Sequence, residues 1–274
     1  MSDCEFLVND YFSETQIQVV YADHQQTFPN HLKDDIDQKW QQQLQQAEKS
    51  GNRLFDGELL RLDAFEYTEA PSVQRRLVLH LSKTRYRNFV CTNMLLQQRN
   101  GLWDDAFLAN PLGLSALIIC SDNKAILGLR GKGTFLYSGF WHTFGGVADT
   151  DDVDKKGGVR PFQVILREVT EELGIVSGDV TQMVCMGLVR DSAVLQPELI
   201  FRINIRQSST DVLSVIHQPS ASIDEEHDRI IAVNTEAAHI EDFIRTHQSR
   251  ITPVAKATLR RYRTLDTAPG ELEE

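Results

Sequence analysis

The sequence predicts an α+β protein built from two units, and three observations lead to this class. Alternation of apolar and polar residues over 17–21 is typical of a strand, whereas apolar residues three and four apart over 161–173 indicate a helix. Runs of both kinds are interspersed along the chain. The length of 274 residues is enough for two units of ordinary domain size.

The composition and charge exclude several classes of protein. Hydrophobic residues make up 41%, enough for real cores, and no apolar run approaches the length of a membrane span. Asp3 and Glu5 stand where a signal peptide would be basic and then apolar. A net charge of −11 disfavours nonspecific binding to nucleic acid or membranes. We therefore expect a cytoplasmic protein that meets an anionic small molecule through a local basic group.

The first predicted unit, an α/β domain over 1–110, contains strands, one long helix and a hairpin. Asn30 is a suitable cap for the helix, and Gly51 follows it. The hairpin would turn around 71–72. The expected strands are 6–8, 17–21, 59–67 and 76–81, and the expected helix is 31–49.

A segment rich in cations and amides, residues 82–93, stands out in this acidic chain. Arg85, Arg87 and Asn93 are its candidates for substrate binding. Helix capping and surface solvation are the alternative roles for the same side chains. A helix ending near Gly101 and a short one over 104–109 follow, and the predicted domain boundary comes next.

The second predicted unit covers 111–265 and alternates strands with helices. The residues 266–274 are expected to form a flexible tail. The expected strands are 114–120, 125–130, 140–144, 183–190, 198–205 and 229–233, and the expected helices are 161–173, 235–247 and 253–265.

The helix over 161–173 has a core face and a carboxylate face. Pro161 suits the first helical position, and Gly174 suits the position just past the end. At 100° per residue the apolar residues form one stripe. Another arc gathers three carboxylates, which are Glu168, Glu171 and Glu172.

That carboxylate arc is electrostatically unfavourable by itself. Like charges three or four apart cost about 0.2–0.5 kcal/mol per pair, and anions in the last turn oppose the helix dipole. A bound cation would offset both terms, and carboxylate oxygens are ligands that Mg²⁺ prefers. A solvated acidic helix end is the alternative.

The segment before this helix favours a phosphate pocket. An apolar run, 140–144, is expected to be a strand that ends in Gly145 and Gly146, where the chain can turn tightly and a ligand can approach the backbone. Arg130, at the end of an earlier strand, is a candidate for phosphate contact. Gly145, Gly146 and Arg130 therefore join the predicted substrate-binding residues.

Residues 167–175, Arg-Glu-Val-Thr-Glu-Glu-Leu-Gly-Ile, match without a substitution the second half of the Nudix box, Gly-x5-Glu-x7-Arg-Glu-U-x-Glu-Glu-x-Gly-U, where U is aliphatic. The chain thus resembles the Nudix hydrolase superfamily. This resemblance implies an α/β/α sandwich with a mixed sheet in the second unit. It also implies metal binding by Glu168, Glu171 and Glu172, with Mg²⁺ as the cofactor and Mn²⁺ as an alternative.

The resemblance also suggests catalytic roles outside the three glutamates. Arg167 lies about 100° around the helix from Glu168, so it is not an obvious phosphate clamp. The resemblance implies that it braces the loop or a glutamate through a salt bridge. One of the three glutamates, or a carboxylate on a neighbouring strand, would act as general base. Glu198 is the candidate neighbour, because it opens a strand after the box and similar enzymes place a glutamate there. A solvated residue at a strand start is its alternative role.

The first half of the box departs from the pattern. The expected glycine and glutamate fall on Val153 and Val159. If Gly146 is the box glycine, the loop around 149–158 is about seven residues longer than usual. An insertion of this kind indicates a less usual branch of the superfamily.

Short segments between about 54 and 262 resemble one branch in particular, the animal Nudix-type UDP-glucose and UDP-galactose pyrophosphatases, which also carry an N-terminal extension and a long insertion in the box. Those segments are 55–56, 60–62, 86–93, 110–113 and 253–262. The similarity implies Mg²⁺-dependent cleavage of a UDP-hexose to UMP and hexose 1-phosphate. Two alternatives stay open: hydrolysis of ADP-ribose, a dinucleoside polyphosphate or a damaged nucleotide, and ligand sensing without catalysis.

Overall fold

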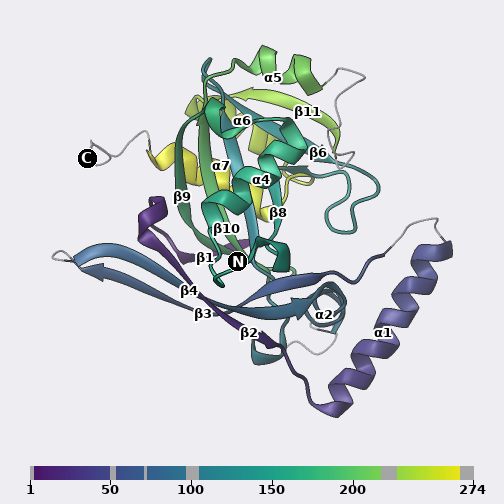
Figure 1. Ribbon diagram of the computed structural model, residues 1–274. Coiled ribbons are helices and arrows are strands. Elements are labelled where there is room, and N and C mark those ends of the chain that lie inside the picture. Colours follow the sequence, from purple (N-terminus) through teal and green to yellow (C-terminus); the bar gives the residue numbers. More distant parts are fainter. Residues whose placement is uncertain (1–2, 50–53, 71–72, 97–104, 217–226, 266–274) are drawn as a thin grey trace.

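The computed structural model describes residues 3–49, 54–70, 73–96, 105–216 and 227–265 (Figure 1). The expected turn at 71–72, the helix end near Gly101 and the tail 266–274 lie outside these ranges. Within them, no helix is both long and apolar enough to cross a membrane.

An eight-stranded mixed sheet forms the centre of the larger unit. All neighbours in it are antiparallel except β10 and β5, which run parallel. Two short strands branch from the main path: β7 (Trp141–His142) pairs with β6, and β8 (Phe144–Val147) pairs with β5. The main order is β1 (Cys4–Val8), β9 (Val180–Asp191), β10 (Pro197–Ile205), β5 (Gly113–Ile119), β6 (Lys124–Arg130) and β11 (His227–Asn234).

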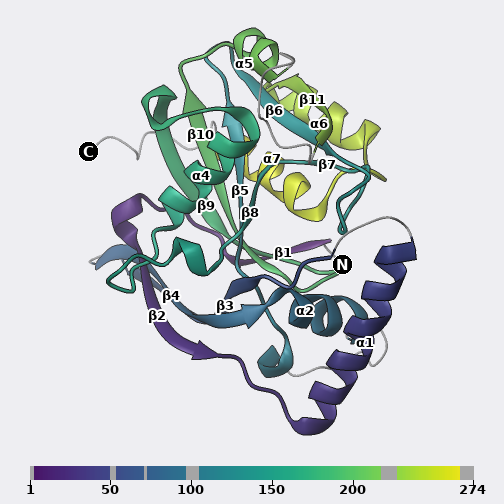
Figure 2. The same ribbon diagram turned by 45° about the vertical axis from the view of Figure 1, so that its right-hand side comes forward.

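Helices cover both faces of this sheet, as Figures 1 and 2 show. α4 (Pro161–Leu173) and α5 (Ser209–Ile216) lie on one face, and α6 (Ala237–Thr246) and α7 (Pro253–Leu265) lie on the other. β5 is apolar throughout because it is buried on both sides: Leu114 and Ala116 face α4, whereas Leu117 faces α6 and α7. The predicted α+β class and the α/β/α sandwich with a mixed sheet are confirmed.

The smaller sheet has the order β2-β4-β3 and comes from the N-terminal part of the chain. β3 (Glu58–Ala70) and β4 (Val73–Arg85) form the predicted antiparallel hairpin, and β2 (Ile17–Gln25) runs parallel to β4. α1 (Asn30–Lys49) packs its buried Leu32, Ile36 and Trp40 against Val90 and Cys91. These two residues belong to η2 (Val90–Leu96), a π-helical turn that follows α2 (Tyr86–Phe89).

The two sheets share one hydrophobic core. Leu60, Leu79 and Leu81 of the smaller sheet lie in the same buried cluster as Leu114 and Phe144 of the larger one. Backbone hydrogen bonds also join β3 to segments that flank the larger sheet, from Leu60 N to Ala148 O and from Leu62 N to Asn110 O. β1 belongs to the larger sheet, so residues before 110 complete it. The proposed domain limits stay a prediction.

Two elements depart from the sequence prediction. The run 140–144 does not form one strand: β7 ends at His142, and β8 begins at Phe144 and continues through the two glycines. Gly145 and Gly146 therefore lie inside a strand rather than in a turn. α5 was not expected, although Ser208 and Asp211 exchange capping hydrogen bonds at its start. The helices 161–173 and 253–265 begin and end where predicted.

Four short helical turns complete the described chain. They are η1 (Glu14–Gln16), η3 (Asp105–Phe107), η4 (Thr150–Asp152) and η5 (Ser177–Asp179). Of these, η4 lies in the insertion of the box, where the Asp149 side chain caps it by accepting from Asp151 N. The short helix expected over 104–109 is reduced to η3 in the described residues.

Candidate functional site

The three box glutamates of α4 differ in burial. Pro161 begins the helix, and Gly174, with a φ of +71°, ends it in a left-handed cap, which places all three carboxylates in its second half. Glu172 is 5% exposed, whereas the Glu171 side chain is 56% exposed. The Glu168 side chain is mostly buried. The expected carboxylate face is thus half inside the protein.

Glu168 lies directly on the glycine pair of β8. A Cβ atom added to Gly146 would lie 2.6 Å from Cδ of Glu168, which is too close for any side chain. Gly145, with a φ of +150°, approaches β5 so closely that a Cβ atom would lie 2.1 Å from Leu114 O. These glycines therefore allow β8 to lie tightly between β5 and the glutamates of α4.

Arg167 connects the glutamates to the inserted loop. Its guanidinium lies 3.0 Å from Asp152, 2.9 Å from Glu168 and 3.3 Å from Glu171. The arginine braces both the loop and the helix through these ion pairs, and it does not line the cavity described next. The Glu168 and Glu171 carboxylates share one cation.

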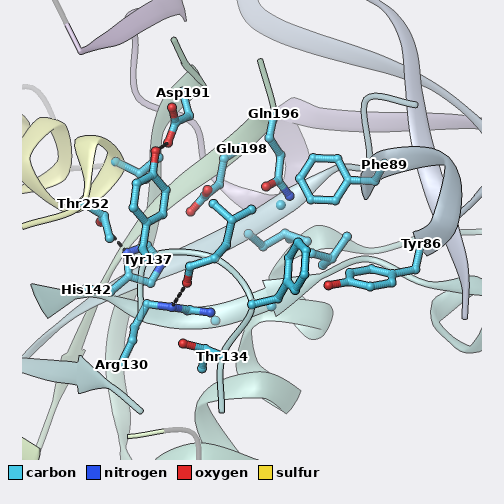
Figure 3. A pocket seen from close by; sticks show the side chains of 18 of the residues that line it. Tyr86, Phe89, Arg130, Thr134, Tyr137, His142, Asp191, Gln196, Glu198 and Thr252 are labelled. Atoms are coloured by element: carbon cyan, nitrogen blue, oxygen red, sulfur yellow. Dashed lines mark hydrogen bonds between the residues drawn. The ribbon is translucent and has the colours of Figure 1, made fainter. Parts of the chain in front are cut away.

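A cavity of about 600 Å³ lies beside the glycine pair (Figure 3). Gly145 and Gly146 form part of its wall, together with Gly113 and Leu114 of β5. The insertion 149–158 contributes no residue to the described lining. The polar side chains that line the cavity include Arg130, Thr134, Tyr137, His142, Asp191, Gln196, Glu198 and Thr252.

Glu198 is the most perturbed acid of this cavity. Burial raises the pKa of its carboxyl group to about 7, and Asp191 adds to the rise, while the Ser115 hydroxyl and Arg130 oppose it. Oε1 of Glu198 is buried and accepts no hydrogen bond of standard geometry from the described residues. Glu198 lies against Gly113, where a Cβ atom would be 3.0 Å from its Cγ. The carboxyl group thus changes charge near neutral pH.

The other polar residues are held by short hydrogen bonds. The Tyr137 hydroxyl donates to Asp191 at 2.6 Å, and Arg130 Nε donates to Leu136 O at 3.0 Å. His142 Nδ1 lies 2.7 Å from the Thr252 hydroxyl. Burial, with Arg130 and His227 nearby, lowers the pKa of His142 well below its usual range. His142 is therefore neutral at pH 7.

The structure does not bring Arg85 and Arg87 to the cavity. Arg85 Nε donates to Asp56 at 2.8 Å, and Arg87 pairs with Asp37 at 3.3 Å and with Asp56 at 3.6 Å. The expected basic patch is therefore neutralised by acidic side chains, and neither arginine lines the cavity. Their neighbours Tyr86 and Phe89, on α2, line it instead.

Asn93 is fully buried and also lies outside the cavity lining. Its side chain accepts from Ala109 N at 2.9 Å and donates to Val194 O at 3.0 Å. Val194 lies in the loop between β9 and β10, which carries Gln196. Asn93 therefore positions a cavity loop rather than facing the cavity itself.

Several cavity residues were not expected from the sequence. Tyr137, Asp191 and Gln196 lie in or beside loops, with no periodic pattern around them. Phe55 and Phe135 also line the cavity and are 82% and 42% exposed. No pattern in the sequence marks these two phenylalanines, because their exposure beside the glycine pair results from the fold. Large exposed aromatics are typical of binding surfaces.

The donor set beside the cavity has suitable chemistry for a hard divalent cation. Glu168, Glu171 and Glu172 supply only oxygen ligands, and the missing side chain of Gly146 lets the Glu168 carboxylate lie directly against β8. Among the described residues, no three His, Cys, Asp or Glu side chains already converge as a metal site. The Glu168 and Glu171 carboxylates form ion pairs with Arg167 instead.

The chain is similar to proteins of known family. It is 25% identical over 239 residues to Nudix hydrolase 9 of Arabidopsis thaliana, and the match covers 73% of each chain. It is 26% identical over 155 residues to the uridine diphosphate glucose pyrophosphatase of Mus musculus, which covers 49% of this chain and 50% of that one. A MutT protein from Methanosarcina mazei superposes with a TM-score of 0.36 at 17% identity, covering 58% of this chain and 96% of that one.

No family model matches the chain. The plant relative nevertheless spans most of both sequences, and the second half of the Nudix box is complete in α4 and lies beside a cavity. The protein therefore belongs to the Nudix hydrolase superfamily.

Proposed function

We propose that the protein is a Mg²⁺-dependent pyrophosphatase that cleaves UDP-glucose or UDP-galactose to UMP and hexose 1-phosphate. The observation that carries this proposal is the cavity beside the glycine pair. Its volume of about 600 Å³ falls within the range of about 300–1,000 Å³ for small-ligand pockets. The mouse relative, a uridine diphosphate glucose pyrophosphatase, supports the choice of nucleotide sugar.

Glu168, Glu171 and Glu172 would hold the metal, since Nudix hydrolases generally use divalent metal ions. A bound dication neutralises charge on the diphosphate and acidifies a water molecule. Gly145 and Gly146 let the diphosphate approach the backbone of β8. Arg130 lines the same cavity and brings a positive charge toward the phosphates.

Glu198 is the proposed general base. A base works best when its pKa lies near the working pH, and burial raises that of Glu198 to about 7. Its carboxylate faces the cavity lined by Gly145 and Gly146 (Figure 3). Glu198 would accept the proton of the attacking water as the bond to the bridging oxygen of the diphosphate breaks.

The aromatic residues of the cavity offer surfaces for the uracil ring. Phe55 and Phe135 are exposed at its edge, and Tyr86 and Phe89 form a wall from the N-terminal unit. Flat apolar faces stack on a base without reading its identity. This arrangement replaces Arg85, Arg87 and Asn93 as the proposed contribution of the N-terminal unit to nucleotide binding.

The experiment compares catalytic efficiencies on UDP-glucose, UDP-galactose, ADP-ribose, ADP-glucose and a diadenosine polyphosphate, with millimolar Mg²⁺ and with a chelator. We expect the UDP-hexoses to lead, UMP and hexose 1-phosphate to appear, and the chelator to abolish turnover. If ADP-ribose is hydrolysed more efficiently than both UDP-hexoses, the proposed substrate is wrong.

A matched pair of variants tests the metal ligands in the same assay. Glu172→Gln keeps the size of the side chain and should remove hydrolysis while leaving the melting temperature within a few degrees. Glu66→Gln alters an exposed glutamate on β3 that pairs with His80, and it should retain full activity. A fully active, folded Glu172→Gln variant would remove that residue from the metal site.

A further inference from the structure

One side of the cavity is lined by side chains that can accept hydrogen bonds. The Tyr137 hydroxyl, the Glu198 carboxyl and the Gln196 side chain lie there, and we name these three residues the acceptor wall (Figure 3). Tyr137 comes from the loop before β7, Gln196 immediately precedes β10, and Glu198 is the second residue of that strand. The acceptor wall faces the same cavity as the proposed diphosphate site.

Tyr137 is oriented as an acceptor by Asp191. Its hydroxyl donates to Asp191 Oδ2 at 2.6 Å, while Oδ1 of the same carboxylate accepts from Ala193 N at 2.7 Å. Asp191 is 3% exposed, so the hydroxyl proton stays directed toward it. Burial and Asp191 raise the pKa of Tyr137, which keeps the phenol protonated. The remaining lone pairs of the Tyr137 oxygen are available to a ligand.

Gln196 and Glu198 are brought together by a glycine. A Cβ atom at Gly113 would lie 3.0 Å from Glu198 Cγ and 3.3 Å from Gln196 Nε2, so the absent side chain leaves both residues room beside β5. The backbone of Gln196 is fixed because its carbonyl accepts from Asp191 N at 3.1 Å. Asn93 holds the same loop through Val194 O.

The chemistry of the acceptor wall selects among the parts of a nucleotide sugar. Phosphate groups at neutral pH carry almost no hydrogen-bond donors, so they cannot donate to the acceptor wall. Uracil offers one N–H donor and two acceptors. A hexose presents several hydroxyl donors in different directions. Among these three parts, the hexose matches the acceptor wall best.

We propose that the acceptor wall is the hexose subsite, where Tyr137 and Gln196 accept hydrogen bonds from sugar hydroxyl groups. This assignment rests on the proposed function. It places the uracil on the aromatic side of the cavity and the diphosphate between the two, beside Gly145, Gly146 and Arg130. Tyr137 and Gln196 are then residues that determine the sugar specificity.

The test compares UDP-glucose with the methyl ester of UDP. The methyl ester keeps the nucleoside and the diphosphate, but a methyl group replaces the hexose and its hydroxyl groups. Tyr137→Phe and Gln196→Leu should each lower kcat/KM for UDP-glucose by about three- to tenfold, as expected for one lost neutral hydrogen bond. Both variants should hydrolyse the methyl ester within twofold of the wild-type rate.

A matched control is Tyr67→Phe, because the Tyr67 hydroxyl donates to Asp10 at 2.7 Å outside the cavity lining. Tyr67→Phe should leave kcat/KM unchanged for both UDP-glucose and the methyl ester. Deoxy analogues of UDP-glucose then identify the contacted hydroxyl group: on the analogue that lacks it, the variant and the wild type should have equal efficiencies.

The outcomes distinguish a failure of the proposed function from a failure of the hexose subsite. If wild-type protein hydrolyses no UDP-hexose, the proposed function falls and the hexose subsite with it. If the wild type prefers UDP-hexoses but Tyr137→Phe and Gln196→Leu slow the methyl ester equally, or slow neither substrate, the hexose subsite is wrong and the proposed function stands. Melting curves check that each variant is folded.

Discussion

Glu198 illustrates how burial at a single residue prepares a chemical group. A carboxyl group in water ionises near pH 4.3, whereas burial raises the pKa of this one to about 7. An acid in a cavity whose pKa is strongly shifted is a candidate for catalysis. The absence of a hydrogen bond of standard geometry to its buried Oε1 leaves that atom able to accept a proton from a ligand or water.

At this scale we predict that Glu198→Gln lowers kcat/KM on UDP-glucose by about 10²–10⁴-fold, the usual contribution of a general base. The wild-type efficiency should rise with pH up to about 7 and then level off, because the base must be ionised. The variant should lose this rise. A pH profile that keeps its wild-type shape in Glu198→Gln would assign the base to another group.

The pH dependence of stability tests the pKa of the Glu198 carboxyl group independently of activity. Its folded pKa lies above its unfolded pKa, so its contribution to stability is complete below about pH 4.5 and is lost as pH rises through about 7. The full loss would be about 3 kcal/mol. Glu198→Gln should therefore be relatively more stable than the wild type at pH 8 than at pH 5, as measured by urea unfolding.

At the scale of elements, the sequence predicted those whose boundaries are set locally. α4 and α7 begin at prolines, and α4 ends at Gly174 in the left-handed conformation, so their limits could be read from single residues. The split of 140–144 into β7 and β8 could not be read in this way. It depends on pairing with two different strands, β6 and β5, and on the close approach of Gly145 to Leu114.

The candidate site also combines residues that the local sequence predicts with residues that only tertiary packing brings together. The three glutamates, Arg167 and the glycine pair belong to a short continuous stretch and were predicted as a group. Tyr137, Asp191, Gln196 and the aromatic residues come from separate loops, and only tertiary packing brings them to one cavity. The basic segment 82–93 was misleading because the charges that neutralise it, on Asp37 and Asp56, lie far from it in sequence.

Asn93 positions a cavity loop, whereas Arg87 forms ion pairs outside the cavity, and this difference gives a prediction at the scale of elements. Asn93→Ala would remove the Asn93 partner of Val194 O, at about 1–3 kcal/mol for that group, and would leave Ala109 N with the Thr92 hydroxyl at 3.1 Å as an acceptor. We expect a lower melting temperature and a loss of UDP-hexose hydrolysis through the displaced Gln196 loop. Arg87→Ala should stay within about twofold of wild-type kcat/KM. If Arg87→Ala loses tenfold while Asn93→Ala is unaffected, the assignment of these two roles is reversed.

For the whole molecule, the main consequence of the fold is that the cavity and the core both draw on the two sheets. Tyr86 and Phe89 enter the cavity from the N-terminal part, whereas Glu198 and Gly146 enter it from the larger sheet. The buried leucines of β3 and β4 complete the core below β5 and β8. The N-terminal part is thus built into both the core and the cavity of the enzyme.

We therefore predict that a fragment of residues 111–265 does not fold alone. It lacks β1 at the sheet edge, and it exposes Leu112, Leu114 and Phe144, which are each at most 1% exposed in the full chain. Uncovering each side chain costs about 1.5–3 kcal/mol, so the sum is comparable to the roughly 5–15 kcal/mol that stabilises a domain. Circular dichroism should show no cooperative melting for the fragment and one transition for the full chain. Co-expression with residues 1–110 is the control, and it should restore a folded complex that hydrolyses UDP-glucose. A fragment that melts cooperatively by itself would show that residues 111–265 form an independent domain.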